Sequence, residues 1–98
     1  MLTTKQKVYL RSLAQKIKPT FQIGKGGLND NMANDIVNYL IKHELIKISI
    51  LQNCEEDDDD VIEFFESYGM EFIQKIGRQF IFYMQSDDAK NPIELPRK

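Results

Sequence analysis

The chain has no tryptophan, and it carries one cysteine and one histidine among its 98 residues. The lone thiol, Cys54, cannot form an intramolecular disulfide, so we expect a cytoplasmic protein rather than a disulfide scaffold. No apolar run approaches the roughly 20 residues that cross a membrane. The first residues also lack the apolar core of a secretory signal. These absences predict a single domain with no membrane partner.

The shortage of catalytic residue types also argues against an enzyme. A Ser/Cys–His arrangement would have to use His43, and no acid–base pair stands in a recognisable setting. Six consecutive acids over residues 55–60 lack the glycine and the spacing of a calcium loop, so they favour a solvated helix start over a metal site. We therefore expect no catalytic residues, metal, cofactor or small-molecule substrate.

The net charge of −2 conceals two halves of opposite sign. Residues 1–54 carry eight Lys or Arg against three acids, a balance of +5, whereas residues 55–98 carry five against twelve, a balance of −7. A basic half favours a polyanionic partner, although both halves could simply be solvated surface.

A glycine-rich loop lies inside the basic half, at Gly24, Lys25, Gly26 and Gly27. Glycine lets backbone amides approach a ligand, and a helix N-terminus behind such a loop attracts phosphate. The spacing Gly-x-x-Gly is the one with which RNA-binding KH domains clamp a nucleic-acid backbone. The P-loop and the dinucleotide fingerprint both need glycines that this loop lacks. From the loop alone, a tight strand-to-helix turn that binds nothing is the alternative.

Hydrophobic periodicity predicts seven elements in the order α-β-α-β-α-β-β. Helices are expected over residues 4–17, from a cap at Asn29 or Asp30 to His43, and up to Tyr68. Strands are expected over residues 20–23, 45–51, 70–76 and 79–84. Thr3 and Gln6 have the spacing of a capping box, and Gly77-Arg78 is typical of a tight hairpin. We expect a two-layer α/β domain with a four-stranded mixed sheet over residues 1–85, followed by a frayed polar C-terminal tail over residues 86–98.

Several separated segments together resemble the CRM domain, named for chloroplast RNA splicing and ribosome maturation, and most closely its bacterial single-domain (YhbY-like) form. The matching residues are Leu2-Thr3, Gln6, Leu10, Leu13, Ala14, Pro19, Gly24-Lys25-Gly26-Gly27-Leu28, His43-Glu44-Leu45-Ile46-Lys47, Gly77-Arg78 and Tyr83. The resemblance implies a fold similar to the C-terminal domain of translation initiation factor three. It also implies an RNA-binding protein that associates with ribosomal RNA or precursors of the large ribosomal subunit and assists ribosome assembly. Separately from the resemblance, we expect a monomer.

The predicted RNA contacts fall into three groups. The loop supplies Gly24, Lys25, Gly26 and Gly27, flanked by Gln22 and Asn29. Helix one and its end extend the positive surface with Lys5, Lys7, Arg11 and Lys18. The third group, Lys42, His43 and Lys47, resembles the basic patch of the family. His43 could equally serve only to stabilise the C-terminus of its helix.

We expect recognition of structured RNA by backbone and shape, because most aromatic residues fit core positions. The possible exceptions are Tyr9, Tyr39 and Tyr83. Phe82-Tyr83-Met84 stands where the family usually has Leu-Tyr-Arg, and the acidic run suggests that the third helix faces away from RNA. A protein-interaction module that acts through the acidic half, without direct RNA contact, is the alternative.

Overall fold

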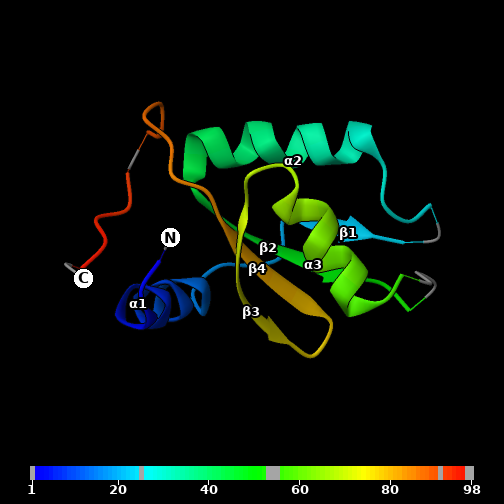
Figure 1. Cartoon of the computed structure of the whole chain (residues 1–98), viewed down its shortest axis with the longest axis horizontal. Coiled ribbons are helices and arrows are strands. Elements are labelled where there is room, and N and C mark those ends of the chain that lie inside the picture. The colour runs from blue at the N-terminus through cyan, green and yellow to red at the C-terminus, as the bar shows by residue number, and fades with distance from the viewer. Residues whose placement is uncertain (1, 25, 53–55, 91, 97–98) are drawn as a thin grey trace.

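The structure is a computed structural model that describes residues 2–24, 26–52, 56–90 and 92–96. Its elements are α1 (Thr4–Ala14), β1 (Phe21–Ile23), α2 (Asp30–His43), β2 (Leu45–Ile50), α3 (Asp58–Glu66), β3 (Glu71–Ile76) and β4 (Gln79–Tyr83), shown in Figure 1. The predicted order of elements is confirmed. Within these ranges, no helix has both the length and the apolar character needed to cross a bilayer.

The ends of the first two helices follow from local hydrogen bonding. Both bonds of the predicted capping box between Thr3 and Gln6 are present at the start of α1. The helix ends at Ala14 instead of the predicted Ile17, because the chain tightens into a turn before Pro19. In that turn the N–H of Ile17 donates to the carbonyl oxygen of Ala14 at 3.1 Å, a bond that satisfies a helix-end carbonyl in 3₁₀ fashion.

The four strands form one mixed sheet in the order β1-β2-β4-β3. β1 pairs with β2 in parallel, with Ile23 opposite Ile50, and α2 makes the crossover between them. β4 is antiparallel to both β2 and β3. The predicted hairpin between β3 and β4 is confirmed, and Gly77 takes the positive φ of 59° that its turn requires.

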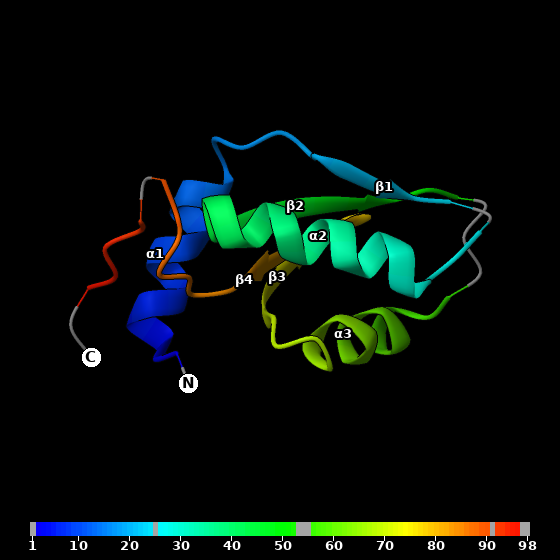
Figure 2. The same cartoon turned by 90° about the horizontal axis from the view of Figure 1, so that it is seen from above.

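The predicted α/β fold class with a four-stranded mixed sheet is confirmed, and helices cover both faces of this sheet, so that α1 adds a layer to the two that were predicted. Ile46 and Phe82 pack under α2 and α3 in one core cluster, whereas Leu45 and Ile81 pack with Leu10 of α1 in a second cluster. Central strands that are apolar on both faces need cover on both faces. Figures 1 and 2 show α1 at the end of the molecule opposite to the segment that joins β1 to α2.

The described part of the C-terminal tail is bonded to the domain, so the expectation that it frays is wrong. Ile93 and Leu95 pack against the core cluster beneath α1. The side-chain amide of Gln6 donates to the carbonyl oxygen of Pro96 at 3.1 Å. The buried carboxylate of Glu44 accepts the N–H groups of Ser86 and Ile93. These bonds hold residues 86–90 and 92–96 against the ends of α1 and α2.

Candidate nucleic-acid interface

The glycine loop connects β1, an edge strand, to α2. Its turn is closed by the N–H of Gly27, which donates to the carbonyl oxygen of Gly24 at 2.9 Å. Gly27 has a φ of 65°, whereas Gly26 is exposed and has open space where a Cβ would stand. Lys25 lies outside the described residues. The backbone at Gly26 is therefore open to a ligand.

The N-terminus of α2 is already occupied by groups of the protein. The side-chain oxygen of Asn29 accepts the N–H of Met32 at 2.8 Å as an N-cap. Asp30, the first helical residue, adds a negative charge and accepts a hydrogen bond from the Tyr68 hydroxyl, and this bond raises the pKa of Tyr68. Groups of the protein thus already compensate much of the helix dipole. The binding of a phosphate would depend more on the open loop and on neighbouring cations.

An acidic side chain lies directly beside the loop. A Cβ at Gly27 would stand 3.3 Å from the Oε1 atom of Glu56. The two segments that carry these residues come to the same end of the molecule in Figures 1 and 2. Glu56 precedes α3, so this contact is separate from the expectation that the third helix faces away from RNA. The Glu56 carboxylate lowers the local potential at the position where a phosphate would approach.

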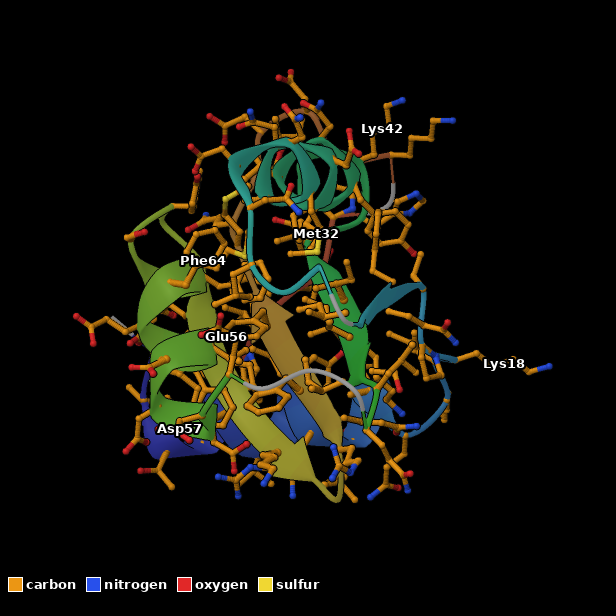
Figure 3. The ribbon with its side chains drawn as sticks, turned by 90° about the vertical axis from the view of Figure 1, so that its right-hand side faces the viewer. Lys18, Met32, Lys42, Glu56, Asp57 and Phe64 are labelled. Carbon is orange, nitrogen blue, oxygen red and sulfur yellow. The ribbon has the colours of Figure 1, made fainter. Side chains whose placement is uncertain are left out.

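β1 and the outer side of α2 form one flank of the molecule, which we call the β1–α2 flank. Lys18 and Lys42 project from it on the same side of the molecule in Figure 3, while Asp57 lies across the molecule beside α3. Gln22 and His43 are also exposed on these elements. The flank thus joins a basic surface at one end of α2 to the glycine loop at the other.

Aromatic contacts hold the flank together. The ring of Phe21 meets Tyr39 edge-on with centroids 5.9 Å apart. Tyr39 in turn lies against the His43 ring at 4.3 Å, with the two planes inclined by 33°. Edge-on and offset arrangements of this kind are the favoured geometries of aromatic pairs. They hold the side chain of His43 beside the ring of Tyr39.

The structure does not bring the other predicted cations to the loop. Lys5, Lys7 and Arg11 lie on α1, which Figures 1 and 2 place at the opposite end of the molecule. The Nε atom of Arg11 is buried and has no hydrogen-bond partner among the described residues. Lys47 lies on β2 and is 8% exposed, so little of it reaches solvent. These four residues do not form one surface with Gly26.

Sequence reasoning missed two features of this region. Glu56 lies beside the loop because α3 packs beside α2, and no local sequence pattern predicts that contact. Lys16, in the turn after α1, borders a groove together with Tyr39 and His43 of α2. Tyr39 itself was named from the sequence as an aromatic residue that could lie outside the core. Over the described ranges, no three His, Cys, Asp or Glu side chains gather as a metal site would require.

Comparisons with known proteins give a consistent result. The model of the CRS1/YhbY (CRM) domain matches residues 2–84. The chain is 50% identical to the probable RNA-binding protein YqeI of Bacillus subtilis, covering 98% of this chain and all of the relative. It is 35% identical to an RNA-binding protein of Haemophilus influenzae, over 99% of this chain and 97% of the other. A Staphylococcus aureus structure, described as a candidate RNA-binding protein, matches with a TM-score of 0.74 and 47% identity, covering 98% of this chain and 100% of that one.

Proposed function

Because the chain belongs to the CRS1/YhbY (CRM) domain family, we propose that it binds RNA through the glycine loop and the β1–α2 flank. The observation that carries the proposal is the open backbone at Gly26, next to the flank from which Lys18 and Lys42 project. The names of the relatives support the same activity. Phosphates would lie against the loop and the cations, and the edge strand would carry the RNA between them through Gln22.

The proposed contacts are a subset of those expected from the sequence. They comprise Gly24, Lys25, Gly26, Gly27, Gln22, Asn29, Lys18, Lys42 and His43. Lys5, Lys7 and Arg11 would form a separate positive region on α1, and Lys47 is too covered to contribute much. Since these groups present charge and backbone amides, we infer recognition of RNA mainly by shape and phosphate position.

The partner that we propose is ribosomal RNA, within precursors of the large ribosomal subunit in the cytoplasm. The support is the family to which the chain belongs, whose bacterial single-domain form it resembles over nearly its whole length. A protein without an identified catalytic site would act there by binding, and so would assist ribosome assembly. Sedimentation of the protein with large-subunit precursors from a lysate tests this part separately from RNA binding itself.

The direct test is a titration with ribosomal RNA at two salt concentrations. Phosphate contacts release counterions, so the affinity should fall steeply as salt rises. The Gly26→Asp variant should bind more weakly, because it places a carboxylate at the open point of the loop. Gln85→Glu is the matched control, since it adds the same charge at an exposed position beyond the far end of β4. Equal affinities for Gly26→Asp and Gln85→Glu would remove the loop from the mechanism.

A titration in which the unchanged protein shows no affinity for ribosomal RNA at either salt concentration would contradict the proposal as a whole. That result would favour a protein-interaction module acting through the acidic residues of α3. Circular dichroism of both variants shows whether the fold is kept. Gly26 has no positive φ and no close neighbour, so the Asp substitution should leave the fold intact.

A further inference from the structure

A groove opens at the end of α2 that is far from the glycine loop. It measures about 390 Å³, within the usual range for small-ligand sites. Its apolar lining comes from Leu13 within α1 and Ile17 just after it, from Leu45 at the start of β2, and from Ile93 in the C-terminal segment. The glycine loop contributes nothing to it, so the groove is a second feature of the same molecule.

One wall of the groove is aromatic. Tyr39 and His43 both line it, and their rings lie 4.3 Å apart. The edge-on contact with Phe21 and the 3.5 Å approach of the Thr20 hydroxyl to the Tyr39 hydroxyl keep the tyrosine in place. A planar ring entering the groove would therefore meet a wall that is already positioned for stacking, at little cost in side-chain entropy.

The rim of the groove is basic. Lys16 and His43 line it, and no acidic residue belongs to the described part of its lining. Lys18 follows closely in the chain, and Lys42 precedes His43 at the exposed end of α2. An apolar, aromatic interior with cations at its edge complements a flat heterocycle that is attached to a phosphate chain. A neutral apolar peptide would gain nothing from this charge.

We propose that the groove binds one unpaired base of a single-stranded RNA segment, stacked on Tyr39, with an adjacent phosphate near Lys16 and Lys18. The inference rests on the proposed RNA-binding function and deepens it. The 14 residues of α2 separate the groove from the glycine loop by about 20 Å. The same strand can therefore follow the β1–α2 flank from the groove to Gly26, so that the groove anchors a base while the loop holds the backbone.

The test uses the full chain with two probes, hexa-adenylate and inorganic polyphosphate, a polyanion without bases. Tyr39→Leu removes the stacking ring but keeps an apolar side chain, and His43→Ala alters an exposed residue that carries less risk to the fold. We expect Tyr39→Leu to bind hexa-adenylate about tenfold more weakly, the effect of losing one base–aromatic stack. We expect His43→Ala also to weaken binding, because it removes the ring that lies beside Tyr39. Binding of polyphosphate to Tyr39→Leu should remain unchanged. Tyr9→Leu is the matched control, on an exposed tyrosine of α1.

Nuclear magnetic resonance locates the bound base. The proposal is supported if hexa-adenylate, but not polyphosphate, causes ring-current shifts in the signals of Tyr39, Leu13 and Ile93. Two results overturn the groove proposal alone. One is an unchanged affinity for hexa-adenylate in both groove variants. The other is that hexa-adenylate does not bind, although ribosomal RNA still binds and Gly26→Asp weakens its binding. Failure of the unchanged protein to bind any RNA overturns this proposal together with the proposed function.

Discussion

The Oε1 atom of Glu44 accepts a hydrogen bond from the backbone N–H of Ile93 at 2.7 Å, across 49 positions of the chain. The other carboxylate oxygen accepts the N–H of Ser86 at 2.8 Å. Glu44 is 1% exposed and forms the C-cap of α2 with a φ of 65°. One buried side chain therefore ties the end of α2 to the C-terminal segment and holds Ile93 in the wall of the groove.

The first prediction concerns this carboxylate. Glu44→Gln keeps the size of the side chain but turns an amide group toward a backbone N–H, so one charge-assisted bond is lost. We expect the free energy of unfolding to fall by about 1–3 kcal/mol, measured by urea denaturation. Hydrogen exchange at the Ser86 and Ile93 amides should accelerate. Glu94→Gln, the same change at an exposed neighbour, is the control, and equal stabilities of the two variants would contradict the prediction.

This bond also shows which part of the fold could not be read from the sequence. The helices, the hairpin and the alternation of Phe80 and Phe82 with Ile81 depend on local periodicity, and the structure confirms them. The position of the C-terminal segment depends on Glu44, a distant acceptor with no local signal. The side of the sheet on which α1 packs is likewise decided by long-range contacts, since an apolar stripe does not specify which face it will cover.

The candidate interface divides in the same way. The glycines predicted the loop correctly, because the effect of a glycine on the backbone is local. The cations of α1 looked equivalent to the other predicted contacts in sequence, yet α1 lies at the end of the molecule opposite the glycine loop. The groove and the position of Glu56 arise from segments that are distant in the chain, so charge counting could not find them.

The second prediction separates the two neighbouring glycines of the loop. Gly27→Ala should lower the free energy of unfolding by about 1–2 kcal/mol, the cost of a non-glycine residue in the left-handed region, and its Cβ would stand 3.3 Å from Glu56. Gly26→Ala should be nearly neutral, because the space around it is open. Thermal or urea unfolding of the two variants measures the difference. A Gly26→Ala variant as unstable as Gly27→Ala would refute this assignment.

The third prediction concerns the carboxylate beside the loop. Glu56→Gln removes a negative charge next to Gly27, so a phosphate should approach with less repulsion. We expect affinity for ribosomal RNA to rise a few-fold at low salt, with a smaller gain at high salt because ions screen the charge. Glu63→Gln is the control, since it makes the same change at an exposed position further along α3. An equal gain in the control would mean that net charge alone is responsible.

The fourth prediction is a late titration of one tyrosine. Burial, followed by the negative charges of Glu44 and Glu71, raises the pKa of Tyr83 from 10.0 to about 12. The unfolded chain therefore releases this proton before the folded protein does. The contribution of Tyr83 to stability is fully present below pH 10 and is lost as the pH rises through the interval up to about 12.

Phenolate absorbance in the near ultraviolet measures this directly. One tyrosine of the folded protein should ionise near pH 12, and that component should disappear in Tyr83→Phe. Urea denaturation should show the unchanged protein losing more stability than Tyr83→Phe between pH 10 and 12, because only the former carries the titrating group. Identical losses of stability in the two proteins would show that Tyr83 ionises normally. The core beneath α1 would then admit more water than the 3% exposure of Tyr83 implies.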